Sequence, residues 1–214
     1  MKKIVPIVVA ALAMCLCLAF LPACSSQPSP SEVTKSALDA FKAQDTETLA
    51  KYYSGNVEDM TSQIEAAANS NGEGASDAQS ALESTMMQKM LDFDYTLGEE
   101  TIEGDTATVG VSLTTYDMGT ALGNALTNYI SNAFAAAFSG AGQDELEDMF
   151  YQELQSELEA LTDKSYTADF DVTLTKGESG WMLDAFSDEA TNAFSGGMMD
   201  AANSVSESLS GMTE

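Results

Sequence analysis

Few side chains of this 214-residue sequence could act as a nucleophile or a base. The chain contains three cysteines but no histidine and no arginine, so the Ser–His and Cys–His pairs of nucleophilic catalysis cannot form. No imidazole can serve as a general base near neutral pH. Carboxylates and tyrosines remain, and some isomerases use such a pair in an apolar site. No spacing marks an Asp–Tyr pair here, so we expect no catalytic residues and no enzymatic activity.

Oxygen ligands for a hard cation are plentiful, because the chain has 34 acidic residues. Asp92, Asp94, Thr96 and Glu103 imitate the acidic spacing of an EF-hand calcium loop. Leu97, however, stands where that loop needs a glycine for its sharp turn, and the residues around it alternate between apolar and polar in the manner of a strand. We therefore expect no metal site and no cofactor.

Cys24 is the cysteine whose surroundings favour a covalent modification. Two lysines followed by an apolar run to residue 20 are typical of an export signal. Leu21, Pro22, Ala23 and Cys24 then resemble a lipobox, the signature of bacterial lipoproteins. The resemblance implies that residues 1–23 are removed as a signal peptide. It also implies that acyl chains such as palmitate, attached at Cys24, hold the protein on the extracytoplasmic face of the cell membrane. An ordinary signal peptide or an uncleaved anchor is the alternative.

Removal of residues 1–23 would leave 191 residues, enough for one domain with a sizeable core. Two lysines would leave with the signal, which takes the formal net charge from −26 to −28. So strong a negative charge excludes nucleic-acid binding, which depends on cationic contacts to phosphates. It also opposes adsorption to anionic lipid, so we expect membrane attachment through the lipidated Cys24. That cysteine would be the last one left, so no internal disulfide can form.

Helical periodicity dominates the first third of the chain, beyond a flexible tether at residues 24–30. Ser31 is expected to cap a helix that carries Val33 and Phe41 on one face, and Asp45 is expected to cap a second, shorter helix. Two further helices are predicted at residues 57–68 and 77–91.

Strand periodicity appears later. Alternation of apolar and polar residues predicts strands at residues 93–97, 107–113, 166–174 and 181–185. Turns rich in glycine, at residues 103–105 and 176–180, would join neighbouring strands into hairpins. A short helix at residues 188–195 and a last helix or tail at residues 196–214 would follow.

The sequence between residues 118 and 143 contains no charged side chain. Apolar residues recur there at every fourth position, which predicts a long helix buried against the sheet or another helix. These residues are Met118, Leu122, Leu126, Ile130, Phe134 and Phe138. The many Asn, Thr and Gly residues between them make the helix too polar to span a bilayer. Asp144, with Glu147 three positions later, predicts a capping box for a second helix that reaches residue 161.

Two groups of residues resemble the cystatin-like, nuclear-transport-factor-like superfamily. The first is the helix–turn–helix run from Val33 to Tyr53, with Asp45 at its turn. The second combines the strand pattern of residues 105–111 with the closing residues 180–183, Gly-Trp-Met-Leu. The particular similarity is to bacterial lipoproteins of unknown function in that superfamily. It implies an α+β fold over residues 31–195, with N-terminal helices packed on a curved antiparallel sheet and residues 118–161 as a two-helix insertion between strands.

A domain of that kind has a concave sheet face that can hold a ligand. Face alternation predicts the residues that would line such a groove: Phe41, Tyr52, Tyr95, Val109, Val111, Phe170 and Trp181. The first hypothesis is a membrane-anchored, non-catalytic module that binds a small apolar ligand or a protein. The second is a structural or envelope-interaction protein that meets its partner through its anionic surface and residues 118–161. The third is a small-molecule isomerase or hydrolase-like enzyme, which requires a buried Asp–Tyr pair in an open pocket.

Overall fold

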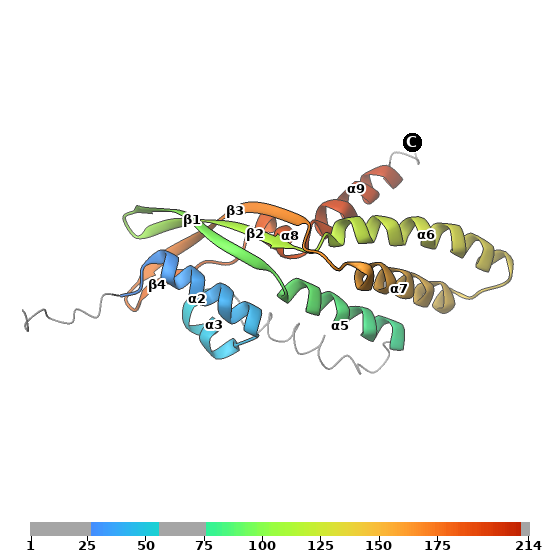
Figure 1. Ribbon diagram of the computed structural model, residues 1–214, viewed down its shortest axis with the longest axis horizontal. Helices are drawn as coiled ribbons and strands as arrows, with labels where there is room; N and C mark the ends of the chain where they lie inside the picture. Colours follow the sequence, from blue (N-terminus) through green and yellow to red (C-terminus); the bar gives the residue numbers. More distant parts are fainter. Residues whose placement is uncertain (1–26, 56–75, 211–214) are drawn as a thin grey trace, which may run out of the picture.

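The computed structural model describes residues 27–55 and 76–210. Figure 1 shows an elongated molecule, with a β-sheet and its covering helices toward one end and a group of helices at the other. The fold class is α+β, as predicted. Each end has its own hydrophobic core, and both cores are built by residues between Val33 and Ala201. A chain of residues 25–214 therefore contains all the described residues of both cores.

The sheet is an antiparallel meander in the order β1-β2-β3-β4. Its strands are β1 (Asp94–Glu103), β2 (Thr106–Thr115), β3 (Tyr166–Gly177) and β4 (Gly180–Leu183). These positions confirm the strands predicted from alternation, and β1 and β2 meet at the predicted turn around Gly104. β2 and β3 pair along the whole length of β2, although two helices separate them in the sequence.

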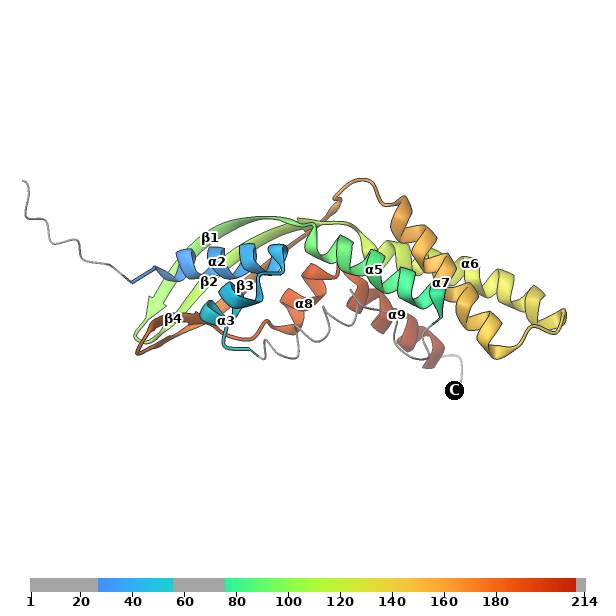
Figure 2. The ribbon, with the colours of Figure 1, turned by 90° about the horizontal axis from the view of Figure 1, so that it is seen from below.

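Helices cover the apolar face of this sheet. Ala107, Val109, Val111 and Leu113 of β2 are buried, whereas the residues between them are at least partly exposed. Helices α2 (Pro30–Ala43), α3 (Thr46–Tyr52) and α8 (Asp188–Phe194) lie beneath the arch of the strands in Figure 2. The sheet thus buries one face and leaves the other to solvent, as antiparallel sheets commonly do.

Aromatic rings fill the space between the sheet and its helices. The ring centroid of Phe194 lies 5.2 Å from those of Phe41 and Phe93 and 5.7 Å from that of Phe170. Phe194 reaches this position because α8 follows β4 and returns across the face of β3. The protein's own rings therefore occupy the covered face of the sheet.

Four of the described helices form the other end of the molecule: α5 (Asp77–Leu91), α6 (Met118–Phe138), α7 (Gln143–Ala160) and α9 (Met198–Ser210). α5 has the bounds predicted for the helix at residues 77–91. α6 and α7 form an antiparallel hairpin inserted between β2 and β3, and they pack on α5 and α9. Their shared core is built on Leu82, Met118, Ala121, Leu122, Ala125, Leu154 and Leu158.

The predicted start of the first helix is wrong by two residues. Ser29 caps α2, because its side chain accepts a hydrogen bond from the backbone N–H of Glu32. Pro30 then opens the helix at a position where its missing N–H would have had no partner. Ser31 instead donates its hydroxyl to the carboxylate of Glu100 on β1, with 2.5 Å between the oxygens. Ser31 therefore fastens the helix to the sheet.

The predicted capping box of α7 is also absent. α7 begins after Gly142, which has no side chain to accept a hydrogen bond, and Asp144 already lies inside the first helical turn. The acidic first turn still favours the helix electrostatically, since it lies at the positive end of the helix dipole. Asp45, by contrast, caps α3 as predicted, through a hydrogen bond from the N–H of Thr48.

Three predictions fall outside the described residues: the signal peptide, the lipidation of Cys24 and the helix at residues 57–68. Within residues 27–55 and 76–210, no helix, α6 included, is both long and apolar enough to cross a membrane.

Candidate interaction surface

The apolar stripe predicted for α6 does not stay buried. Met118 is fully buried and Leu122 is 9% exposed, but Ile130 is 65%, Phe134 69% and Phe138 80% exposed. The prediction that the stripe is buried along its length is therefore wrong.

The spacing of the stripe explains its exposure. An α-helix turns by about 100° per residue, so a residue at every fourth position advances about 40° beyond each full turn. Over the five steps from Met118 to Phe138 the stripe rotates by about 200° around the helix axis. It begins in the helical core and ends on the opposite side of α6, in solvent.

Ile130, Phe134 and Phe138 form an exposed apolar patch, here named the outer stripe. The rings of Phe134 and Phe138 pack edge to face, with their centroids 4.9 Å apart. Elsewhere among the described residues, Ile102 and Met199 are the other exposed large apolar side chains; both are less exposed than the stripe and lie on other elements, β1 and α9. A contiguous exposed apolar patch marks an interaction site more often than scattered single residues do.

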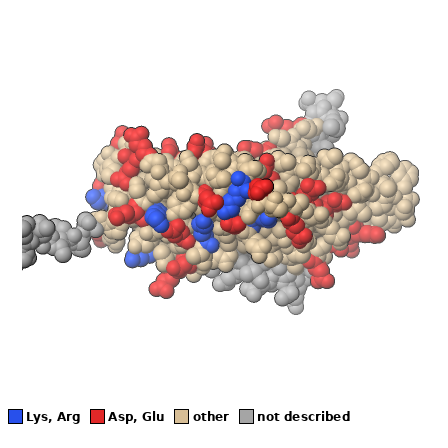
Figure 3. Space-filling view, viewed as in Figure 1, with Lys and Arg blue, Asp and Glu red and all other residues tan. Residues whose placement is uncertain are grey.

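Charge is distributed very unevenly around the outer stripe. Residues 118–161 contain seven carboxylates and no lysine or arginine. Asn132 of α6 donates to Glu153 of α7, with 2.8 Å between Nδ2 and Oε1, and Asn128 donates to Glu157 at 3.0 Å. These asparagines lie on the same turns of α6 as Ile130 and Phe134. In Figure 3 the hairpin end is mostly tan with acidic residues along one side and no blue. Positions two apart lie about 160° apart around a helix, so the stripe faces away from the asparagines and the carboxylates that they hold.

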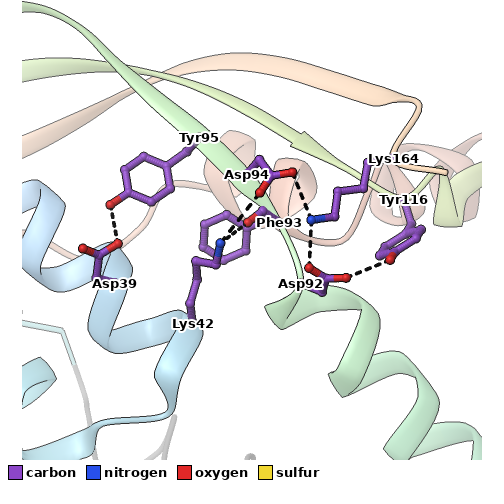
Figure 4. A network of polar contacts seen from close by, with 8 residues as sticks. All are labelled: Asp39, Lys42, Asp92, Phe93, Asp94, Tyr95, Tyr116 and Lys164. Atoms are coloured by element: carbon purple, nitrogen blue, oxygen red, sulfur yellow. Dashed lines mark hydrogen bonds and ion pairs between the residues drawn. The ribbon is translucent and has the colours of Figure 1, made fainter.

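Lysine side chains gather instead where the sheet meets the helical end (Figure 4). The Nζ atom of Lys164 lies 2.8 Å from a carboxylate oxygen of Asp92 and 3.0 Å from one of Asp94. Tyr116 also donates its hydroxyl to Asp92, with 2.7 Å between the oxygens, and Lys42 of α2 donates to the carbonyl of Phe93. These contacts join the α5–β1, β2–α6 and α7–β3 connections at one place.

Lys89 of α5 adds a further link at this junction. Its Nζ donates to the carbonyl of Leu161, at 2.6 Å, and lies 4.0 Å from the ring centroid of Tyr116. Three of the six lysines beyond residue 23, Lys42, Lys89 and Lys164, thus help to hold the two ends of the molecule together.

Two Asp–Tyr pairs are hydrogen-bonded among the described residues, Asp92 with Tyr116 and Asp39 with Tyr95. Hydrogen bonds from Lys164 and Tyr116 lower the pKa of Asp92, and the bond to Asp92 raises the pKa of Tyr116. Tyr95 donates to Asp39 at 2.6 Å, and its burial, together with that carboxylate, raises the pKa of Tyr95. General acid–base catalysis near neutral pH needs a base with a raised pKa and an acid with a lowered one. Here the pKa of Asp92 is lowered and the pKa values of Tyr95 and Tyr116 are raised, which is the opposite direction.

The predicted groove residues lie near one another, but most of them form the core. Phe41, Val109, Val111, Phe170 and Trp181 are each at most 9% exposed and belong to the cluster that also contains Phe194. Tyr95 is partly buried at the edge of that cluster, with its hydroxyl directed to Asp39 in Figure 4.

A small, mostly apolar hollow lies beside this core. Tyr52 and Trp181 line it together with Pro28, Val33 and Met182, and its volume is about 200 Å³. Pockets for drug-sized ligands are usually larger, roughly 300–1,000 Å³. That the groove residues bind a small apolar ligand stays a prediction.

The residues that imitate an EF-hand do not converge on one point. Asp92 and Asp94 pair with Lys164, whereas Glu103 lies at the far end of β1, opposite Thr106. Nowhere in residues 27–55 and 76–210 do three potential metal-ligating side chains of the acidic, cysteine or histidine type come together.

Comparison with known proteins gives limited information. No protein-family model matches the chain, and no curated protein matches it. Among solved structures it is similar to that of "a putative lipoprotein (ycdA)" from Bacillus subtilis, with 14% sequence identity and a TM-score of 0.47. The match covers 77% of this chain, which spans 57% of the length of the other. A likeness at this level assigns no function to the present chain.

Sequence reasoning located the hairpin but missed its exposed surface. The signal was present in the spacing, because an apolar repeat of four positions cannot remain on one side of a helix with 3.6 residues per turn. The lysine junction had no comparable signal. Lys42, Lys89 and Lys164 are far apart in the chain, and only the sheet pairing and helix packing bring them together.

Proposed function

We propose that this protein is a lipid-anchored, extracytoplasmic and non-catalytic binding module whose partner is a protein bound at the α6–α7 hairpin. The outer stripe carries the proposal. A strongly anionic chain leaves Ile130, Phe134 and Phe138 in water on a helix without charge. Burying such a side chain fully is worth about 1.5–3 kcal/mol, so a partner that covers them would gain affinity without any change in the fold.

The placement of the hairpin supports a binding function. In Figures 1 and 2, α2 begins at one end of the long axis and the loop between α6 and α7 lies at the other. A lipid on Cys24 would therefore attach the molecule by the end opposite to the hairpin. The outer stripe would then project away from the membrane, where a protein partner can reach it.

The proposal includes two more specific expectations, a cystatin-like fold and the absence of catalysis. The order of two helices, a meander and a final aromatic hairpin is in keeping with a cystatin-like domain that carries the α6–α7 insertion. The absence of catalysis is supported by the direction of the Asp92 and Tyr116 pKa shifts. An isomerase or hydrolase of that superfamily would need a raised pKa on the aspartate that acts as the base and a lowered pKa on the tyrosine that acts as the acid.

Site-specific photo-crosslinking tests the binding surface. A photoreactive amino acid is placed at position 134 in the full-length chain, and cells that produce it are irradiated. Ile102 is the matched control position, since it is also an exposed apolar residue but lies on β1. We expect a protein adduct from position 134 and none from position 102. Adducts of equal yield at both positions, or none at position 134, would contradict the proposal.

The anchor is tested separately with Cys24→Ala. If Cys24 carries the lipid, the variant accumulates as an uncleaved precursor or is released from the membrane, and it no longer incorporates labelled palmitate. A cleaved Cys24→Ala protein that stays on the membrane would disprove lipid anchoring at this residue.

A small apolar ligand is a second candidate, favoured by the hollow beside Tyr52 and Trp181. Trp181 is the single tryptophan of the chain, so its fluorescence reports on this site alone. A short brominated alcohol that enters the hollow should quench it at saturable concentrations, and Tyr52→Ala should weaken the effect. Quenching that is linear in concentration and unchanged in the variant would reflect collisions in solution and exclude the site.

A further inference from the structure

We propose that the hollow beside Tyr52 and Trp181 binds an anionic amphiphile, with a single alkyl chain inside the hollow and a negatively charged head at its mouth, beside Lys51. This proposal rests on the second candidate function, because it names the chemical class of ligand for the same hollow. It does not depend on the protein partner proposed for the α6–α7 hairpin.

The lining of the hollow changes from apolar to polar toward solvent. Val33 of α2 and Trp181 of β4 are buried, and neither is more than 8% exposed. Tyr52 is partly exposed, whereas Lys51 of α3 and Ser179 of the β3–β4 turn are exposed. Buried lining residues form the bottom of a hollow and exposed ones form its mouth. An alkyl chain would therefore be buried against Val33 and Trp181. A polar head would stay at the mouth, near Lys51 and Ser179.

The charge at this hollow differs from that of the molecule as a whole. The chain has a formal net charge of −26, and three other hollows of the described surface each include at least one carboxylate in their lining. Among the described residues that line this one there is Lys51 and no carboxylate. Glu178, next to Ser179 in the turn, is exposed and not part of the lining. A negatively charged head would therefore meet a cation at the mouth.

Two lysines lie over the aromatic walls of the hollow. The Nζ atom of Lys51 is 4.9 Å from the ring centroid of Tyr52, and that of Lys176 is 5.4 Å from the ring centroid of Trp181. Among the described residues neither ammonium group forms an ion pair or a hydrogen bond. The other four lysines beyond residue 23 contact carboxylates or backbone carbonyls. Apolar walls combined with two cations that lack a counter-charge fit a ligand with an apolar chain and an anionic head.

The size of the hollow limits the length of the alkyl chain. Its volume is about 200 Å³. An apolar cavity of about 150 Å³ in another protein holds benzene, so a chain of about six to eight carbons would fill this one. A longer chain would leave part of itself in water and gain little from the extra carbons.

The hollow lies at the end of the molecule where the proposed anchor attaches. α2, α3 and β4, which contribute to its lining, lie together at that end in Figures 1 and 2. A Cβ atom on Gly180, another lining residue, would lie 3.7 Å from the side chain of Gln27. Three residues lead from Gln27 back to Cys24, a span of at most about 11 Å. If Cys24 carries the lipid, the bilayer would supply single-chain amphiphiles close to the hollow.

Titration of Trp181 fluorescence in the chain of residues 25–214 provides the test, with sodium octanoate as the probe. Each control compound lacks one feature of the probe: 1-octanol has the chain without the charge, octylammonium reverses the charge, and acetate has the charge without the chain. We expect saturable binding of octanoate, several-fold weaker binding of octanol and octylammonium, and none of acetate.

A series of chain lengths tests the volume. From butanoate to octanoate, each added methylene group should strengthen binding by up to about fourfold, because it is removed from water. Binding should then strengthen no further in decanoate and dodecanoate, because the hollow is full.

Variants of the protein test the role of the two lysines. Lys51→Met and Lys176→Met remove one charge each and keep an apolar side chain. Each should weaken octanoate binding several-fold and leave octanol binding unchanged. Lys35→Met is the matched control, because Lys35 is an exposed lysine of α2 that does not line the hollow, and it should bind octanoate as the wild type does. Isothermal titration calorimetry repeats the comparison, since Lys176→Met changes the surroundings of Trp181 itself.

The remaining outcomes would overturn the proposal in different ways. Equal binding of octanol and octanoate would keep the apolar ligand of the second candidate function and reject its anionic head. Stronger binding of octylammonium would show that the net negative charge of the chain selects the ligand. Affinity that keeps rising beyond octanoate, or an equal loss in Lys35→Met, would mean adsorption outside the hollow. Binding lost only in the lipidated protein would make the acyl chain of Cys24 the occupant. No saturable binding of any alkyl compound would reject this proposal together with the second candidate function, and the crosslinking result at position 134 would stand.

Discussion

The backbone N–H of Gly119 donates a hydrogen bond to the carbonyl oxygen of Gly196, with 2.9 Å between nitrogen and oxygen. The bond joins the first turn of α6 to the turn between α8 and α9. A Cβ atom on Gly119 would lie 2.7 Å from the carbonyl oxygen of Gly197, so no larger residue fits without movement of the backbone. Gly196 and Gly197 adopt φ values of +57° and +79°, which other residues rarely do. Gly119, Gly196 and Gly197 thus permit the close backbone contact where α6 meets the turn between α8 and α9.

Gly119→Ala should therefore destabilise the protein, by about 1–3 kcal/mol, because the added methyl group overlaps backbone atoms that cannot rotate away. Gly123→Ala is the matched control on the same helix, since no atom lies within 4 Å of the Cβ that it would add. That change should stabilise the chain by up to about 1 kcal/mol through helix propensity. Urea unfolding followed by circular dichroism measures both. Equal effects of the two substitutions would show that the close backbone contact does not matter.

Lys164→Met should reduce the loss of stability in acid. The bonds from Lys164 and Tyr116 lower the pKa of Asp92 below its ordinary 3.8, so the folded protein binds a proton there less readily than the unfolded chain does. The resulting stabilisation is complete above the unfolded pKa and disappears as the pH falls through the lowered folded value. Because both carboxylates are more than half exposed, the ion pairs contribute about 1 kcal/mol or less.

Melting temperatures measured between pH 6 and pH 2 provide the comparison, with Lys51→Met as the control, because the described ion pairs do not include Lys51. The wild type and the control should lose stability below about pH 4, whereas Lys164→Met should lose less. Superimposable pH profiles for all three proteins would rule out a contribution from this junction.

Phe134→Ser should change the free energy of unfolding by no more than about 0.5 kcal/mol, because the side chain is already in water. Leu158→Ala should cost about 2–5 kcal/mol, since Leu158 is fully buried in the helical core and leaves a cavity. Thermal unfolding of the two variants tests whether the outer stripe serves the fold. A large loss in Phe134→Ser would mean that the aromatic residue packs inside the protein and is unavailable to a partner.

Thr34→Val should stabilise the protein by about 1 kcal/mol. Thr34 is fully buried in α2, and its hydroxyl has no hydrogen-bond partner among the described residues. Valine has a similar shape without the cost of burying an unpaired hydroxyl. Thr191→Val is the control, because the Thr191 hydroxyl donates to the carbonyl of Ser187 and that bond would be lost. A Thr34→Val protein less stable than the wild type would indicate that the hydroxyl does find a partner.

Local sequence patterns predicted the elements well where one interaction dominates. The alternation of Ala107, Val109, Val111 and Leu113 predicted β2, because a strand buried on one face needs it. Asp45 predicted the start of α3 for a similarly local reason, the hydrogen bond to the N–H of Thr48. The caps of α2 and α7 were misplaced because Ser31 is as well suited to capping as Ser29, and Asp144 is better suited than Gly142. The hydroxyl of Ser31 instead donates a hydrogen bond to Glu100, which is 69 residues away in the sequence.

The sequence by itself determined the α+β class, the charge of the hairpin and the rotation of the apolar stripe around α6. Composition, strand alternation and the angle between successive residues of a helix are properties of the chain alone. Tertiary structure decided which side chains meet: Phe194 returns across the sheet and fills its concave face, and Lys42, Lys89 and Lys164 converge on the junction. Such contacts join residues that are distant in sequence. They contribute to stability only once the strands have paired and the helices have packed.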